Sequence, residues 1–215
     1  MRRGVLVSVE GPDGAGKTTL VRALAERFWR SGIDAVVARD PGGTPIADAA
    51  RGLVLDPSLD ASPAAELFLY LAARAELVTR IIEPALRRGR LVLVDRFELS
   101  TLAYQVGGRG LPRDLVLRAN RLATRGVKPE VTLVLDVPAF LGARRQRSAG
   151  KIRDRLEGET AGWHGRVAGV FRKARGKGIV HVDARRAAGA VERDAWAVLA
   201  RRLPEPFRRQ MGEIQ

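Results

Sequence analysis

Five short runs of apolar residues recur along the chain, and each lies between stretches with helical spacing. They are Val5–Val9, Ile33–Ala38, Leu91–Val94, Val131–Leu135 and Ile179–Val182. Nearly continuous Val, Leu and Ile indicates strands that are buried on both faces, which is typical of a parallel sheet covered by helices. The pattern therefore predicts an α/β fold.

Start and stop signals predict where the helices lie between these runs. A first helix should run from Lys17 to about Arg30. Thr44-Pro45 and Ser62-Pro63 each place a capping residue before a proline at the first helical position, which predicts a short helix toward Leu55 and a long one to about Arg87. Pro84 should kink the long helix. Further helices are expected over Glu98–Val106, from Pro112 to near Gly126, within Pro138–Glu157, and over Glu159–Arg175 and Arg186–Leu203.

A glycine-rich loop joins the first strand to the first helix. It reads Gly11-Pro12-Asp13-Gly14-Ala15-Gly16-Lys17-Thr18. Glycines let backbone N–H groups wrap closely around a polyphosphate, and the start of the helix adds its positive dipole end. Lys17 can then reach the β- and γ-phosphates, while the Thr18 hydroxyl can ligate Mg²⁺. A simple strand-to-helix turn would give no reason for Lys-Thr at this spacing.

Length, cysteine content and apolar run length limit the possible classes of protein. The 215 residues predict one domain spanning 1–215, and the absence of cysteine excludes disulfides, thiolate metal sites and cysteine nucleophiles. Val5–Val9 is too short for the core of a signal peptide, and no run approaches the length of a membrane span. We therefore expect a cytoplasmic protein without a membrane partner.

The formal net charge of +14 has three possible explanations. Such a charge is compatible with nucleic-acid binding, with a cavity built for anions, or with an arginine-rich proteome. Aromatic residues make up only 5% and do not alternate with the arginines as a stacking platform would require. Nucleic acid is therefore an unlikely partner.

Two more segments are expected at the carboxyl edge of the sheet, where ligands of open α/β folds bind. Asp95-Arg96 ends the third strand, so a carboxylate could hold Mg²⁺ there and a guanidinium could grip a phosphate. Arg39-Asp40-Pro41-Gly42-Gly43-Thr44 ends the second strand and forms either a plain turn or one wall of an acceptor pocket. Tyr70 and Arg74 are one helical turn apart, where they are either a core aromatic and a surface arginine or a base-stacking ring and a base-binding cation.

Taken together, these segments resemble the thymidylate kinases. The blocks that carry the resemblance follow the family's order over roughly positions 5 to 160. They are Glu10 to Thr19, Arg39 to Thr44, Tyr70-Leu71-Ala72-Ala73-Arg74, Asp95-Arg96-Phe97, Ser100 to Gln105, Gly107 to Leu111, and Leu135-Asp136-Val137-Pro138.

The resemblance implies a fold and a reaction. The fold would be a P-loop NTPase three-layer sandwich with a five-stranded parallel sheet, and the protein would be a homodimer. The reaction would be transfer of the γ-phosphoryl group of ATP to dTMP, giving dTDP and ADP, with Mg²⁺ as cofactor. No general base would be required, because the acceptor phosphate is already an anion.

The resemblance also implies site residues. ATP would contact Gly11, Asp13, Gly14, Ala15, Gly16, Lys17, Thr18, Thr19 and Arg144, and dTMP would contact Asp13, Pro41, Tyr70, Arg74, Arg96, Thr101, Tyr104 and Gln105. Thr18 and Asp95 would hold the metal, and Lys17, Asp95 and Arg96 would take part in catalysis. The backbone of Val182-Asp183-Ala184 would touch adenine.

An arginine-rich lid would complete the site. Family members without a basic residue in the middle of the P-loop draw the transition-state arginine from a mobile lid, and this chain has Gly14-Ala15 at that place. The lid would cover approximately 142–157, with Arg147 or Arg155 as the acting arginine.

Two alternatives remain open from the residues. One is a kinase for another nucleotide or nucleoside, because Pro12, Asp40, Phe97 and Val106 depart from the family pattern and leave acceptor specificity among pyrimidine nucleotides undecided. The other is a P-loop protein that binds nucleotide and works as a nucleic-acid-associated module.

Overall fold

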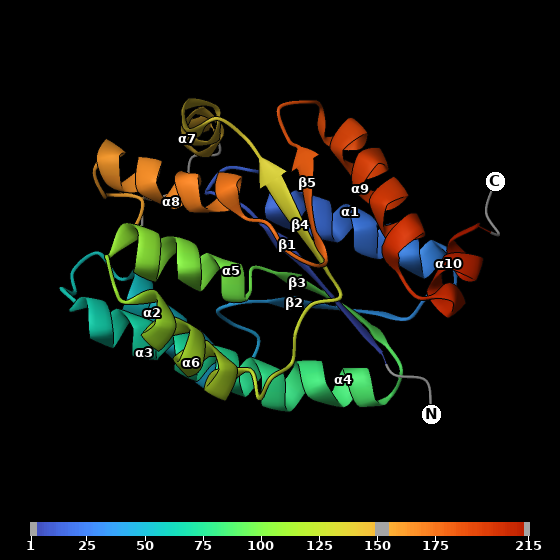
Figure 1. The fold of residues 1–215 in the computed structure, drawn as a ribbon, viewed down its shortest axis with the longest axis horizontal. Coiled ribbons are helices and arrows are strands. Elements are labelled where there is room, and N and C mark those ends of the chain that lie inside the picture. Colours follow the sequence, from blue (N-terminus) through green and yellow to red (C-terminus); the bar gives the residue numbers. More distant parts are fainter. Residues whose placement is uncertain (1–3, 149–154, 213–215) are drawn as a thin grey trace.

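The computed structural model describes residues 4–148 and 155–212, whose centre is a parallel sheet (Figure 1). Its strand order is β2-β3-β1-β4-β5. The strands are β1 (Val5–Glu10), β2 (Ala35–Arg39), β3 (Leu91–Asp95), β4 (Val131–Asp136) and β5 (Ile179–Asp183). All four pairings are parallel, with β1 between β3 and β4, so the predicted five-stranded α/β sheet is confirmed.

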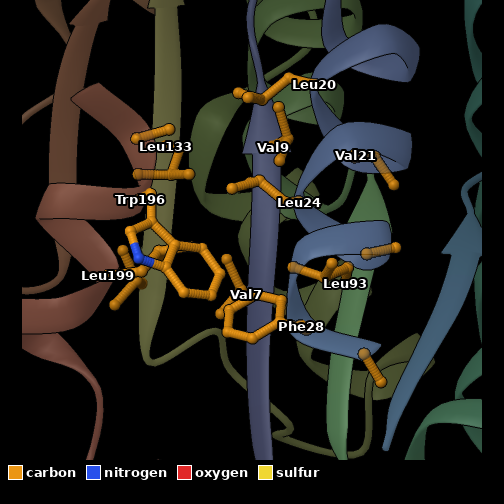
Figure 2. Packing of buried hydrophobic residues seen from close by; sticks show 14 of the residues in the cluster. Val7, Val9, Leu20, Val21, Leu24, Phe28, Leu93, Leu133, Trp196 and Leu199 are labelled. Carbon is orange, nitrogen blue, oxygen red and sulfur yellow. The ribbon is translucent and has the colours of Figure 1, made fainter. Parts of the chain in front are cut away.

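Alternate residues of the central strand serve two separate hydrophobic layers. Val5, Val7 and Val9 pack with Leu24 and Phe28 of α1 (Lys17–Arg30), and Trp196 and Leu199 of α9 (Ala188–Arg202) join the same cluster (Figure 2). Leu6 faces the other way, toward the layer that contains Leu77, Val78 and Ile82. Because side chains alternate along a strand, one buried strand binds helices on both faces and fixes the three-layer arrangement.

Two helices begin at the capping residues that the sequence predicts. The Thr44 hydroxyl accepts a hydrogen bond from the Ala47 N–H at 3.2 Å at the start of α2 (Pro45–Leu55). The Ser62 hydroxyl accepts one from the Ala65 N–H at 3.3 Å at the start of α3 (Pro63–Leu77). In both, a proline takes the first helical position, where its missing N–H costs nothing.

Two of the predicted helical stretches contain π-helical turns. The stretch after Ser62 divides into α3, the π-helix η1 (Val78–Ile82) and α4 (Glu83–Arg87). The wider turn ends just before Pro84, where an α-helix would lack an N–H donor and meet a steric clash. The stretch after Phe97 divides into α5 (Glu98–Thr101) and the π-helix η2 (Leu102–Gly108).

The remaining helices are α6 (Arg113–Ala123), α7 (Ala139–Ser148), α8 (Ala161–Lys173) and α10 (Glu205–Gly212). The last helix predicted from the sequence is Arg186–Leu203, so α10 was not expected. Only half of the α10 residues are apolar or glycine, and the packing of the helix depends on one pair four residues apart, Phe207 and Met211. Within the described residues no helix is both long enough and apolar enough to cross a membrane.

The start of α7 lies directly against the P-loop, which is the glycine-rich segment from Gly11 to Thr18. A Cβ atom on Gly142 would come within 2.5 Å of the Asp13 carbonyl oxygen, and one on Gly14 within 2.1 Å of the Gly142 carbonyl oxygen. Two glycines therefore allow the backbones of the P-loop and α7 to touch.

This close approach predicts the effect of a single methyl group. Gly142→Ala should destabilise the protein by about 1–3 kcal/mol, because the Cβ meets backbone rather than a flexible side chain. Gly165→Ala is the matched control, since Gly165 is also helical and nothing lies within 4 Å of its Cβ position. It should stabilise the fold by about 0.5–1 kcal/mol. Urea unfolding of both variants measures this, and equal effects would contradict the close packing.

Candidate active site

The P-loop turns the first helix so that its N-terminus faces the carboxyl edge of the sheet. Gly11, Gly14 and Gly16 have φ angles of 141°, 72° and 93°, which side chains disfavour. No side chain caps α1, and its first turn contains no acidic residue. Its free N–H groups are therefore available to an anion such as a nucleotide phosphate.

Lys17 and Thr18 begin α1 and are both held by neighbours. The Lys17 ammonium donates to the Pro12 carbonyl oxygen at 2.8 Å. Burial, followed by the nearby charge of Arg96, lowers the pKa of Lys17 to about 8. The Thr18 hydroxyl donates to the Asp95 carboxylate at 2.5 Å. These two pairs bring the predicted phosphate and metal residues to one place.

Arg96 occupies the junction between the P-loop and the neighbouring pocket. Its backbone has a left-handed φ of 70°, a conformation that costs about 1–3 kcal/mol for a residue with a side chain. Its guanidinium donates to the Asp13 carboxylate, to the Tyr104 hydroxyl at 3.1 Å and to the Ser100 hydroxyl at 3.1 Å. The Tyr104 hydroxyl in turn donates to Asp13 at 2.7 Å. Burial acts to raise the pKa of Asp13, but the charges of Arg96 and Lys17 outweigh it and hold that pKa below its usual value.

Glu10 lies under this cluster and supports the loop that carries Arg96. Its carboxylate is fully buried and accepts hydrogen bonds from the Phe97 N–H at 2.8 Å, the Ser100 N–H at 3.2 Å and the Ser100 hydroxyl at 2.6 Å. Burial raises the pKa of Glu10 to about 7. No role was predicted for Glu10 from the sequence, although its position directly before the P-loop is a signal that could have drawn attention to it.

A pocket next to Arg96 brings together every residue predicted to contact the acceptor. Its lining includes Asp13, Pro41, Tyr70, Arg74, Arg96, Thr101, Tyr104 and Gln105. They come from the P-loop, the loop after β2, the helix α3, the turn after β3 and the α5–η2 segment. Asp40, Arg51, Leu55, Ser100 and Leu156 complete the lining.

Arg74 is buried at the base of this pocket, not on the surface. Its guanidinium donates to the Asp40 carboxylate at 2.5 Å, to the Thr101 hydroxyl at 2.6 Å and to the Phe97 carbonyl oxygen at 3.1 Å, and also to the Asn120 side chain. Burial raises the pKa of Asp40 although Arg74 acts against it. Arg74 therefore links three walls of the pocket. Because Asn120 lies 46 positions along the chain, local spacing could not reveal this contact.

A second hollow lies on the other side of the P-loop. Its lining includes Ala15, Gly16 and Thr19, Arg145 of α7, and the loop after β5. The Arg145 guanidinium donates to the Ala184 carbonyl oxygen at 2.9 Å. Arg144, predicted to contact ATP, is exposed and is absent from the lining, whereas its neighbour Arg145 is part of it.

Comparison with known proteins agrees with this geometry. The family model of thymidylate kinase matches residues 9–195. The thymidylate kinase of Deinococcus radiodurans is 39% identical over 205 residues, which is 94% of this chain and 99% of that protein. A thymidylate kinase of Synechococcus sp. (strain JA-2-3B'a(2-13)) is 42% identical over 205 residues, covering 93% of this chain and 96% of the relative.

The chain belongs to the thymidylate kinase family. The family resemblance seen in the motifs is confirmed, and so is the prediction that the protein is an enzyme that phosphorylates dTMP with ATP. The individual residue roles stay predictions.

The lid predicted from the thymidylate kinase resemblance is described only at its ends. Residues 149–154 and the side chain of Arg147 lie outside the described part of the chain. The Arg155 guanidinium donates to the Val54 carbonyl oxygen at 3.1 Å and to the Glu66 carboxylate at 2.5 Å. Arg155 is therefore paired with Glu66 of α3 and not with the P-loop. The sequence predicted no role for Glu66, since its partners are 39 to 89 positions away.

The raised pKa of Glu10 predicts how the stability of this thymidylate kinase depends on pH. The folded-state pKa of about 7 lies above the ordinary value of 4.5, so folding favours the protonated side chain. The stabilisation is present below pH 4.5 and is lost as the pH rises to about 7, by on the order of 3 kcal/mol.

Glu10→Gln removes this titration and keeps an oxygen that can accept from the Phe97 and Ser100 N–H groups. We expect the wild type to lose more unfolding free energy between pH 5 and pH 8 than the variant does. Urea unfolding at both pH values measures the difference, in which other titrating groups cancel. Parallel pH dependence in the two proteins would show that Glu10 does not titrate in this range.

Proposed function

We propose that this chain transfers the γ-phosphoryl group of ATP to dTMP with the residues placed around the P-loop and Arg96. The observation that carries the proposal is the position of Arg96. It joins the P-loop through Gly11 and Asp13 and lines the acceptor pocket. A group at this junction can meet both phosphates of a phosphoryl transfer.

On the ATP side, the proposed contacts follow the P-loop. Gly11 to Gly16 would cradle the phosphates with their N–H groups, while Lys17 would place its charge on the β- and γ-phosphates. Thr19 and Arg145 line the second hollow with the loop after β5, which supports adenine binding there. Arg144, the residue first proposed, is exposed.

The proposed chemistry needs positioning and positive charge rather than a base. The acceptor phosphate is an anion at neutral pH, so the barrier lies in bringing two anions into line and in stabilising the transferred group. Arg96 stays protonated because nearby acidic groups raise its pKa further. It can therefore hold the acceptor phosphate without exchanging a proton.

The residues at the start of α1 fit Mg²⁺. Thr18 and Asp95 supply a hydroxyl and a carboxylate oxygen 2.5 Å apart, which are donors that a hard cation accepts. The described residues contain no group of three or more His, Cys, Asp or Glu that could hold a metal, so nucleotide phosphates and water would complete the coordination. When bound, the ion would neutralise charge on the phosphates.

For the acceptor, we propose that Tyr70 stacks on the base, with Pro41 near the thymine methyl group. Arg74, Thr101 and Gln105 would bind the base edge. Asp13 would contact the 3′-hydroxyl, and Tyr104, which is buried beside Asp13, would disfavour a 2′-hydroxyl by its bulk.

The transition-state arginine is proposed to come from the lid, as Arg147 or Arg155. Arg155 would have to exchange Glu66 for the phosphate to act there. An arginine in this role is worth roughly 10³–10⁵ in rate in phosphoryl transfer.

The experiment measures ADP release from Mg²⁺-ATP with dTMP, dUMP, dCMP, dGMP, UMP or no acceptor. We expect turnover that requires dTMP and falls by about 10²–10³ in both Lys17→Met and Arg96→Met, because each removes a charge at the reacting phosphates. Arg209→Met is the control, since Arg209 is exposed and paired within α10. Preference for another acceptor would contradict the dTMP assignment, and unchanged turnover in both variants would contradict the site.

We also propose a cytoplasmic homodimer in which residues 1–215 act as one domain. The support for dimerisation is three exposed apolar stripes at helical spacing on α2, α3 and α6. They are Ile46, Ala49 and Leu53; Ala65, Phe68 and Ala72; and Leu115 and Leu122. The three helices pack together on one side of the molecule (Figure 1). Phe68 at 65% and Leu122 at 82% exposure would be costly to leave in water, and a second copy would bury them.

Phe68→Asp should therefore shift the protein from dimer to monomer, because it places a charge within the apolar interface. Light scattering after size exclusion measures the mass. Phe140→Asp is the matched control, since Phe140 is 74% exposed but lies on α7, away from these helices. A dimer that persists in Phe68→Asp would exclude this face.

A further inference from the structure

We infer that Glu66 is a positioning residue that fixes the side-chain amide of Gln105, so that the pocket accepts a base with an N3–H group and rejects cytosine. The inference rests on the proposed function, because it concerns the base that the acceptor pocket admits. It assigns a role to a charged cluster behind the pocket wall.

Gln105 connects this cluster to the pocket. It belongs to η2, it is 1% exposed, and it lines the pocket beside Tyr70 and Thr101. Its side-chain nitrogen donates to the Glu66 carboxylate at 2.9 Å. Glu66 lies on α3 and is fully buried. The nitrogen of the Gln105 amide is therefore held by a residue that lies behind the pocket wall.

The cluster keeps Glu66 ionised. Arg109 donates to both carboxylate oxygens of Glu66 at 2.9 to 3.1 Å, and Arg155 donates to one of them at 2.5 Å. Burial acts to raise the pKa of Glu66, but hydrogen bonds from Arg109, Gln105 and Arg155 outweigh it and lower that pKa. An ionised carboxylate can only accept hydrogen bonds. The NH₂ group of Gln105, not its oxygen, must therefore face Glu66.

This constraint matters because the two ends of an amide have almost the same shape but opposite hydrogen-bonding character. A glutamine without such a partner can rotate to present either end to a base. With the NH₂ group held by Glu66, the carbonyl oxygen is left for the pocket. The pocket therefore offers a hydrogen-bond acceptor at this wall.

Thr101 is polarised in the complementary sense. Arg74 has only donors, and it donates to the Thr101 hydroxyl oxygen at 2.6 Å, so the hydroxyl proton is left free to donate. An acceptor and a donor on neighbouring residues of one pocket match the N3–H and O4 of thymine or uracil. Cytosine has an unprotonated N3 and an amino group in place of O4. Cytosine would therefore place its N3 acceptor against the Gln105 carbonyl oxygen, and its amino group against the donating hydroxyl of Thr101.

The test compares kcat/KM for dTMP and dCMP in Glu66→Gln. A glutamine at position 66 can donate or accept, so the Gln105 amide is free to turn. We expect the ratio of kcat/KM for dTMP to that for dCMP to fall by at least about tenfold. The reason is that a Gln105 amide that can turn no longer leaves a buried, mismatched polar pair when cytosine binds. The KM for ATP should stay within about twofold of the wild type. Glu159→Gln is the matched control, since Glu159 also pairs with Arg109 but not with Gln105.

A double-mutant cycle with Gln105→Met separates positioning from general support of the fold. Gln105→Met keeps the side-chain volume and leaves Glu66 with both arginines, so it also serves if Glu66→Gln does not fold. We expect Gln105→Met to lower the ratio as well, and the double variant to lower it no further, because Glu66 acts through Gln105.

Three results would overturn the inference: an unchanged ratio in Glu66→Gln or in Gln105→Met, an equal loss in Glu159→Gln, or additive losses in the double variant. A wild-type enzyme that does not phosphorylate dTMP would instead overturn the proposed function. If the wild type prefers dTMP and the variants keep the wild-type dTMP to dCMP ratio, the inference about Glu66 is overturned and the proposed function is not.

Discussion

The position of the Arg96 side chain is the constraint on which the site depends. The residue directly follows β3 in a left-handed conformation, and contacts from two other segments hold it there. Gly11 and Asp13 come from the P-loop, while Tyr104 comes from η2. Glu10 fixes the next turn by accepting the Phe97 and Ser100 N–H groups. The P-loop and the acceptor pocket are thus built around one guanidinium, so their distance from each other is set by the fold.

Buried ion pairs likewise hold the segments that form the walls of the pocket. Asp40 and Arg74 join the β2 loop to α3, and Glu66 with Arg109 and Arg155 joins α3 to η2 and to the far end of the predicted lid. Buried pairs of this kind add little net stability, because desolvation offsets their attraction. Their directional donors and acceptors, however, hold neutral neighbours such as Thr101 and Gln105 in one orientation. We interpret these charges as determinants of pocket geometry more than of stability.

The sequence predicts the parts of this site that arise from local chemistry. Lys17 and Thr18 follow a glycine pattern within one loop, and Asp95-Arg96 ends a recognisable buried strand, so the residues and their place could be expected. The π-helical turns could not be predicted, because an apolar pattern does not distinguish a wider turn from a kink at Pro84. The sequence could not show which of Arg144 and Arg145 faces the second hollow, because adjacent helical residues differ by about 100° in direction and the orientation of α7 depends on its packing. A role for Glu66 could not be predicted, because it depends on hydrogen bonds with Gln105 and Arg109, which are 39 and 43 positions away.

The charges around the P-loop also give a physical reason for anion binding. Lys17 is buried and the Arg96 side chain is only 19% exposed, and the pKa of Lys17 is lowered because burial and Arg96 disfavour a second positive charge. Asp13 offsets part of this repulsion, but its carboxylate is already shared with Arg96 and Tyr104. A polyphosphate beside Lys17 would supply the missing negative charge, so its binding is favoured by relief of repulsion as well as by new hydrogen bonds. The charges of Lys17 and Arg96, which are part of the net charge of +14, therefore favour phosphate binding at the P-loop and the neighbouring pocket, and nucleic acid is not required to explain them.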